Sequence, residues 1–270
     1  MKKQPLLVTA FFLAAALACS LPLASAPAGT PSPLPTATIP PTQNPTLTPT
    51  AAASLYAQWP VLTSSSRESG QAPNYAIETK IPVMQGEDPR VAKFNADVMA
   101  LIMQEVKKFR DGLAELPAKP ISAGSSFESD YAIVSPPGDI LSLNFGFYTY
   151  SDGAAHPYSY TLTYTYDLKR GESIRLEQLF LPGADYLGLI AAYCQDELTR
   201  RDIGFDALFA AGADPTPENY RNWNITPDGL LISFDPYQVA AYAAGPQEVL
   251  IPYAELNAII NPGGPLGVKK

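Results

Sequence analysis

The stretch from Leu141 to Asp167 reads LSLNFGFYTYSDGAAHPYSYTLTYTYD and decides the fold. Its first part repeats large apolar residues at every second position, and its last part alternates tyrosine or leucine with serine or threonine. A period of two is typical of β-strands that bury one face. The break SDGAAHP between the two parts contains glycine and proline, which favour turns. The sequence therefore predicts a long antiparallel hairpin with its tip at residues 151–157.

The clearest helix pattern precedes this hairpin and begins at Asp88-Pro89. Aspartate is a favoured N-cap, and proline suits the first helical position. Apolar residues then recur at steps of three and four, which predicts a long amphipathic helix. They are Val91, Phe94, Val98, Leu101, Ile102, Val106, Phe109 and Leu113. We expect one strand before this helix, at residues 74–83, and another after it, at residues 127–134.

The second half of the chain contributes a further helix and further strands. Tyr186, Leu189, Ile190, Tyr193 and Leu198 form an apolar face within an expected helix at residues 185–201. Apolar runs predict strands at residues 230–234 and 248–251. Helices grouped against an antiparallel sheet define an α+β fold. We therefore expect an antiparallel sheet with two main helices packed against it, in a single domain at residues 71–270.

The N-terminus reads as an export signal. Met1-Lys2-Lys3 is cationic, and the uncharged apolar run that follows, residues 6–18, is too short to span a bilayer, which takes roughly 20 residues. This pattern predicts a signal peptide at residues 1–18. Ala16-Leu17-Ala18-Cys19 resembles a bacterial lipobox, so we expect Cys19 to be lipidated. The competing cleavage site, Ala24-Ser25-Ala26, would yield an ordinary secreted protein.

Residues 19–70 are expected to form a tether. The stretch from 27 to 50 is dominated by proline, threonine, alanine and serine, and such a composition cannot bury enough apolar surface to offset the entropy of ordering. The mature protein is then exported and anchored to a membrane through lipid only, at the cell surface or in the periplasm.

Charge and cysteine content restrict the function further. The net charge of −8 disfavours nucleic acid as a partner and favours a cationic one. If Cys19 carries lipid, then Cys194 is the remaining cysteine and no intrachain disulfide is available. Cys194 lies on the expected second helix, where packing in the core is the favoured role.

His156 is the single histidine of the chain and lies at the hairpin tip. One histidine cannot assemble a multi-histidine zinc site, and Ser151, Asp152 and His156 are too close in one loop to form a catalytic triad. We expect a contact role that depends on pH near the ordinary pKa of about 6.5. The alternative is a peptidoglycan-acting hydrolase with paired carboxylates drawn from the four aspartates near the hairpin. These are Asp130, Asp139, Asp152 and Asp167.

Several ordered motifs resemble a known family. They are Asp152-Gly-Ala-Ala-His-Pro157, Tyr166-Asp-Leu-Lys-Arg-Gly171, Leu176-Glu-Gln-Leu-Phe180, Phe234-Asp-Pro-Tyr237, Tyr242-Ala-Ala-Gly-Pro246 and Ile251-Pro-Tyr-Ala-Glu-Leu256. Together they resemble the RsiV-like extracellular domain of unknown function, shared by the lysozyme-sensing anti-sigma factor RsiV and the non-catalytic part of the peptidoglycan deacetylase PdaC. Residues 75–113 resemble the companion domain that precedes it. The family pattern has two glycines where Gly153-Ala154 stands here.

The resemblance implies an extracytoplasmic binding module with no catalytic residues, no cofactor and no metal. We expect it to recognise a protein, for example a lysozyme-like one, or a cell-wall glycan. Tyrosine suits recognition surfaces, so the expected contacts are the hairpin tip and a second, proline-containing loop. The predicted ligand-binding residues are Tyr150, His156, Tyr158, Pro236, Tyr237 and Tyr242. A purely architectural role in the envelope requires the same tethered, rigid surface and remains an alternative.

Overall fold

The computed structural model describes residues 58–116, 121, 123–135 and 138–267. The expected signal peptide, the expected lipidation site Cys19 and residues 20–57 of the expected tether lie outside the described residues. Within the described part of the chain, no helix combines the length and the apolar character needed to cross a membrane.

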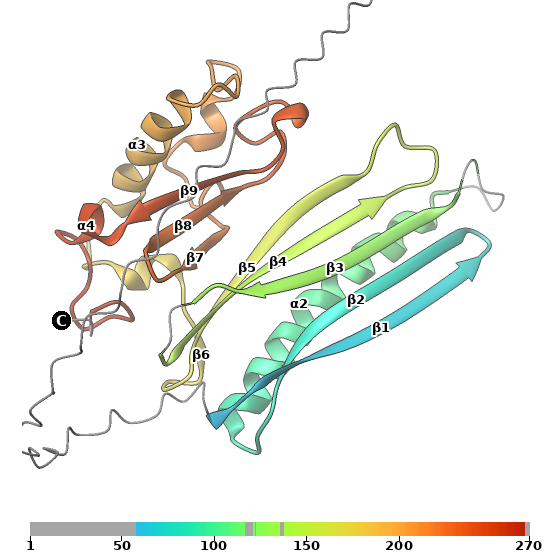
Figure 1. Cartoon of the computed structure of the whole chain (residues 1–270), viewed down its shortest axis with the longest axis horizontal. Coiled ribbons are helices and arrows are strands. Elements are labelled where there is room, and N and C mark those ends of the chain that lie inside the picture. Colours follow the sequence, from blue (N-terminus) through green and yellow to red (C-terminus); the bar gives the residue numbers. More distant parts are fainter. Residues whose placement is uncertain (1–57, 117–120, 122, 136–137, 268–270) are drawn as a thin grey trace, which may run out of the picture. The chain divides into compact units, whose positions relative to one another are not determined.

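A six-stranded sheet forms the first part of the fold (Figure 1). Its strands lie side by side in sequence order: β1 Val61–Gln71, β2 Asn74–Met84, β3 Ser125–Ile133, β4 Ile140–Tyr150, β5 Tyr158–Asp167 and β6 Glu172–Ser173. All neighbouring pairs are antiparallel except β2 and β3, which are parallel. The expected α+β class is confirmed, but the sheet is mixed rather than antiparallel. A helical crossover joins β2 to β3, and such a connection pairs strands in parallel.

Strand β1 occupies residues that the sequence had suggested for the tether. Val61–Gln71 pairs with β2 along its whole length, from Val61 opposite Met84 to Gln71 opposite Asn74. Most of its side chains are exposed, and four of them are serines, so the strand lacks the apolar alternation that reveals β4. The folded region therefore begins before residue 71, the boundary expected from the sequence.

Helix α2, Pro89–Leu113, crosses one face of this sheet (Figure 1). Asp88 caps it as expected, since its carboxylate accepts the backbone N–H of Arg90 at 2.9 Å. A hydrogen bond from the Arg90 side chain lowers the Asp88 pKa to about 2. The buried stripe of the helix contacts the apolar side of the sheet and forms the first core. Its helical members are Val91, Phe94, Val98, Ile102 and Val106.

The β4–β5 hairpin supplies the other half of this core, and its tip lies at residues 151–157 as predicted. Leu141 lies opposite Tyr166, and Phe147 lies opposite Tyr160. The tyrosines of β5 point to the helix side, because the Tyr166 hydroxyl donates to Arg90 O at 2.8 Å. The shared buried face consists of Leu141, Leu143, Phe145 and Phe147. Alternation in the sequence therefore reports correctly which side of the hairpin is covered.

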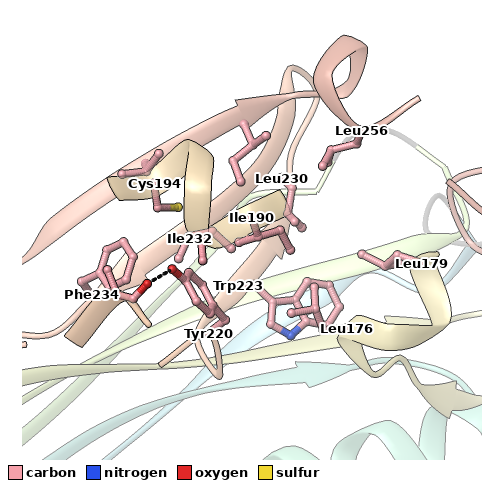
Figure 2. Packing of buried hydrophobic residues seen from close by; sticks show 14 of the residues in the cluster. Leu176, Leu179, Ile190, Cys194, Tyr220, Trp223, Leu230, Ile232, Phe234 and Leu256 are labelled. Carbon is pink, nitrogen blue, oxygen red and sulfur yellow. Dashed lines mark hydrogen bonds between the residues drawn. The ribbon is translucent and has the colours of Figure 1, made fainter. Parts of the chain in front are cut away.

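The second part of the fold has its own sheet and its own core (Figure 2). Strands β7 Trp223–Ile225, β8 Gly229–Phe234 and β9 Gln247–Pro252 form an antiparallel sheet. Helix α3, Tyr186–Thr199, packs against it. Short helices complete this part: η1 Leu176–Leu179, η2 Ala210–Ala213, η3 Tyr242–Ala244 and α4 Tyr253–Leu256. The helix and the two longer strands were expected, but the two main helices belong to different cores and not to one sheet.

Polar groups join the two parts. In β7, the Asn224 Nδ2 donates to Ser142 Oγ and to Leu143 O, each at 2.9 Å, and all of these atoms are buried. The backbone N–H of Trp223 donates to Thr163 Oγ1 at 3.0 Å. We call this set the polar joint. It lies on the face of β4 and β5 that points away from α2.

Candidate binding surface

The hairpin tip, residues 151–157, is anchored at its base by Asp152. The buried Asp152 carboxylate accepts the backbone N–H groups of Ile121 and Gly124, and its own N–H donates to Ser125 Oγ at 2.9 Å. Gly153 has a φ of 86°, a conformation that glycine adopts without strain. These bonds hold the start of the loop against the beginning of β3. The exposed part of the tip ends at His156.

The second loop, residues 235–246, connects β8 to β9 and is anchored by Asp235. Its Oδ1 accepts the N–H of Thr161 on the edge of β5 at 2.8 Å, and its Oδ2 accepts from Arg221 at 2.9 Å. Burial raises the Asp235 pKa, and the two donors oppose this rise. Val239 is buried, so the middle of the loop packs into the second core.

The two loops meet through aromatic rings. The His156 and Tyr242 rings lie 4.2 Å apart between centroids, and Tyr242 Oη donates to Pro157 O at 2.7 Å. The Tyr237 ring lies 5.4 Å from that of Tyr242. We call His156, Tyr237 and Tyr242 the aromatic patch. The sequence predicted all three among the contact residues, on the hairpin tip and on a second loop, and the structure brings their rings together from loops about 80 residues apart in the chain.

Tyr237 is an exposed member of the aromatic patch. Its side chain is 52% exposed, and its φ is 71°. A positive φ is uncommon for a residue with a side chain and is characteristic of positions where function maintains local strain. The surrounding loop holds this conformation, because Gln238 makes hydrogen bonds to Gly212 O and Asn219 O, both at 3.0 Å. The ring is therefore presented on a rigid support.

The other three predicted contact residues lie around this patch at different sites. Tyr158 is 38% exposed and lines a cavity of about 500 Å³ with Asp235 and Arg221. Pro236 lies at the rim of a larger groove on the outer face of the sheet. Tyr150 lies at the end of β4, beside a third hollow lined by Asn74. Tyr158, Pro236 and Tyr150 therefore line three different hollows.

Glu105 and Arg221 also line the cavity beside Tyr158, and sequence reasoning missed both. Glu105 is buried on α2, where it accepts from the Tyr160 hydroxyl at 3.0 Å and from Lys108 at 2.7 Å. Burial, followed by the charge of Glu105, raises the Tyr160 pKa. One signal was available, because Glu105 is a charged residue three positions after Ile102 in the apolar stripe. The position of Arg221 carried no comparable pattern.

The four aspartates proposed for a hydrolase are spread over separate structural roles. Asp130 pairs with Lys80, and Asp139 pairs with Lys169 at 2.7 Å. Asp167 accepts the backbone N–H groups of Lys169 and Arg170 and so closes the turn after β5. Asp152 anchors the hairpin tip, as described above. This distribution gives no support to a shared pair of catalytic carboxylates among them.

Cys194 is buried in the second core, and burial raises its pKa to about 12. The expected packing role of Cys194 is confirmed. Across the described ranges, no group of three or more histidine, cysteine, aspartate or glutamate side chains is arranged to hold a metal ion.

Parts of this chain are similar in sequence to known proteins. Residues 177–254 match the family described as a protein of unknown function, DUF3298. The chain is 28% identical over 193 residues to the peptidoglycan-N-acetylmuramic acid deacetylase PdaC of Bacillus subtilis, a match covering 71% of this chain and 40% of PdaC. It is 34% identical over 82 residues to the esterase Rv3036c of Mycobacterium tuberculosis, covering 30% of this chain and 36% of the esterase. The chain therefore spans less than half the length of these relatives.

Solved structures share the fold. A crystal structure of a DUF3298 family member from Bacteroides fragilis superposes with a TM-score of 0.57 at 16% identity, covering 75% of this chain and 94% of that one. At this identity the likeness concerns the fold alone. The resemblance found in the sequence motifs is confirmed by the family match and by the similarity to PdaC. Residues 177–254 therefore resemble the DUF3298 family, and the chain shares its fold with solved members of that family.

Proposed function

We propose that this chain is an exported, non-catalytic binding module of the cell envelope that recognises a protein or a cell-wall ligand through the aromatic patch. The observation that carries the proposal is the contact between the two loops. His156 and Tyr242 hold the hairpin tip against the second loop, and Tyr237 projects beside them. Aromatic rings on a rigid support give large contact area at a small entropic cost. These are the features of a recognition surface.

Charge supports a cationic partner. The whole chain has a net charge of −8. Opposite charges accelerate encounter and make association sensitive to salt. A lysozyme-like protein is basic and acts on the cell wall, so it is the first partner to test. Peptidoglycan fragments are the second.

Calorimetry with lysozyme at low and moderate salt tests this proposal. Tyr237→Ala should weaken binding roughly tenfold or more, the loss expected when a central aromatic contact is removed from an interface. Leu208→Ala is the matched control, because Leu208 is also apolar and is 79% exposed, but lies outside the aromatic patch. Absence of binding at both salt concentrations removes lysozyme as the partner. Equal affinity of the two variants and the unmodified protein would contradict the role of the aromatic patch.

Export and anchoring form a separate part of the proposal. They rest on the N-terminal pattern, in which Cys19 follows a short apolar run. Growth with a fatty-acid analogue should label the unmodified protein, and Cys19→Ser should abolish the label. A labelled Cys19→Ser protein would show that lipid is attached elsewhere. Cell fractionation of the same two strains then reports whether the variant leaves the membrane fraction.

Hydrolysis is the second candidate function, and the similarity to an esterase over 82 residues favours testing it. The cavity beside Tyr158 holds two buried carboxylates, Glu105 and Asp235, and buried ionisable groups occur at many active sites. Burial raises the pKa of Asp235. Turnover of nitrophenyl esters and of purified wall fragments is the required measurement. Activity that is lost in Asp235→Asn while the fold is retained would replace the binding proposal with an enzymatic one.

A further inference from the structure

The outer face of the six-stranded sheet carries a groove of about 740 Å³, which no part of the proposed function uses. Its floor is made by the side chains of β1 to β5 that point away from α2. Pro236 and Pro246, at the two ends of the second loop, form one wall. Neighbouring strands lie about 4.8 Å apart, so five strands span roughly 19 Å. This is the length of about six residues of extended peptide, at roughly 3.3 Å per residue.

Charged side chains alternate along the floor of this sheet groove. Arg67 pairs with Glu78 at 2.7 Å, and Lys80 pairs with Asp130 at 2.5 Å. Glu128 lies in the same row of the sheet as the Arg67–Glu78 pair, opposite Glu78 on β2. Within the described part of the chain, no lysine or arginine forms an ion pair with Glu128. The sheet groove therefore has one carboxylate more than its cations balance.

An aromatic ring and a hollow lie next to this carboxylate. Tyr148 is opposite Glu128 in the β3–β4 register and is 38% exposed. Two residues along β4, Gly146 leaves the floor without a side chain, and no heavy atom lies within 4 Å of the position that a Cβ would occupy there. A carboxylate beside an aromatic face binds ammonium and guanidinium groups through charge and through cation–π attraction. The hollow at Gly146 provides the space for such a group.

We propose that the sheet groove binds an extended, arginine-bearing peptide segment of a partner, with a guanidinium group between Glu128 and Tyr148 over Gly146. Arginine fits better than lysine, because its planar group stacks on an aromatic ring while donating to a carboxylate. The hydroxyl groups of Ser159 and Thr161, which also line the groove, supply hydrogen bonds for the peptide backbone. This site is distinct from the aromatic patch, and either can fail without the other.

The test uses NMR titration of the full chain with an acetylated and amidated hexapeptide of alternating glycine and arginine. The same peptide with citrulline in place of arginine keeps the shape and removes the charge. We expect the arginine peptide to shift the amide signals of β3 and β4, and to bind at least tenfold more tightly than the citrulline peptide. Equal binding of the two peptides, or shifts confined to other parts of the chain, would overturn the proposal.

Gly146→Val provides the decisive variant, since it changes no charge. Valine suits a strand, and the space above Gly146 is open, so the fold should be retained while the hollow is filled. We expect the affinity for the arginine peptide to fall at least tenfold. Ala132→Val is the matched control, on an exposed position of β3 outside the groove lining. General attraction between a basic peptide and an acidic protein would leave both variants with unchanged affinity, and that outcome would also overturn the site.

Glu128→Gln and Tyr148→Leu separate the contribution of the charge to peptide affinity from the contribution of the aromatic ring. Exposed ion pairs and cation–π contacts are each worth a few-fold in affinity, so we expect each variant to bind roughly threefold to fivefold more weakly. Tyr237→Ala should leave peptide binding unchanged, because Tyr237 belongs to the aromatic patch. If Gly146→Val and Glu128→Gln both bind as tightly as the unmodified protein, the guanidinium position is wrong.

Discussion

The two sheets of this protein are covered in different ways. The six-stranded sheet has α2 on one face and an open groove on part of the other. The central strand of the small sheet, β8, is buried along nearly its whole length, and so both of its faces are covered. The sequences differ accordingly: β4 alternates, whereas β8 reads as the nearly continuous apolar run Leu230-Leu-Ile-Ser-Phe234. A strand with one covered face can present functional side chains on the other, and a strand with two covered faces serves as support.

Buried hydrogen bonds join the two parts of the fold. Each core is apolar, but the hydrogen bonds of the polar joint around Asn224 link the two parts. Buried hydrogen bonds are directional and fix one geometry, whereas apolar surfaces tolerate sliding. We therefore expect the two parts to unfold together, and the following variants test this comparison.

Removing a large ring from the first core should have the largest effect. Phe94 is fully buried and contacts the Tyr164 and Tyr166 rings. Phe94→Ala should lower the free energy of unfolding by about 3–5 kcal/mol, through lost burial and the cavity that remains. Trp59 packs against the first core and Trp223 belongs to the second, so Trp59→Phe and Trp223→Phe each leave one fluorescent reporter. Coincident urea transitions in both backgrounds are expected, and separate ones would show that the parts are independent.

Breaking the polar joint should have the next largest effect. Asn224→Leu keeps the approximate size of the side chain but removes both donors, which leaves Leu143 O and Ser142 Oγ without these bonds. The expected loss is about 1–3 kcal/mol in the free energy of unfolding. The two fluorescence transitions should also move apart in this variant. Asn257→Leu, at an exposed asparagine of the second part, is the control and should leave the transitions coincident.

Loosening the contact between the loops should have a smaller effect. Tyr242→Phe retains the ring beside His156 and removes only the hydrogen bond to Pro157 O. We expect a loss of about 0.5–1.5 kcal/mol in stability. Amide hydrogen exchange at residues 154–156 should accelerate more than exchange within β8. Unchanged exchange in the hairpin tip would show that the ring contact alone holds the two loops.

The smallest expected effect is that of Asp88→Ala, at the cap of α2, and it should depend on pH. The Asp88 pKa is lowered from 3.8 to about 2, so the ionised carboxylate stabilises the folded state above pH 4 and loses this effect as the pH falls toward 2. Asp88→Ala should therefore lower the melting temperature at pH 7, and the difference from the unmodified protein should disappear near pH 2. A difference that stays constant across this range would assign the effect to helix propensity instead of to the charge.

Local patterns in the sequence predicted most of the elements and the β4–β5 hairpin, but not the pairing of the other strands. The Asp88-Pro89 cap and the alternation from Leu141 onward each report a local preference, and both were confirmed. The sequence did not predict strand β1, because its serines are also compatible with a linker. It becomes a strand only by pairing with β2. The sequence did not predict the second core for a similar reason. No local pattern near α3 indicates which sheet the helix packs against.

The candidate site was predictable to the same extent. Its aromatic residues stood out, since His156 is the single histidine and Tyr237 and Tyr242 share one proline-containing loop. The structure places these three rings in contact, whereas their role in binding stays a prediction. The sheet groove was not predictable, because Glu128 and Gly146 become neighbours only through the register of β3 and β4. Charged residues on the exposed face of a strand look alike in sequence, whether they line a groove or merely face solvent.

The parallel pairing of β2 and β3 has a consequence for the order in which the chain acquires its structure. The β1–β2 and β4–β5 pairs are hairpins whose contacts lie close in sequence, so they can close early. Tyr75 must find Ser125 across the whole of α2 before β2 and β3 can pair. Closing that longer loop is slower, because the chain loses conformational entropy before any contact between β2 and β3 stabilises it. We expect the β2–β3 junction to form last, so that a nascent chain exposes two preformed hairpins before it has a sheet.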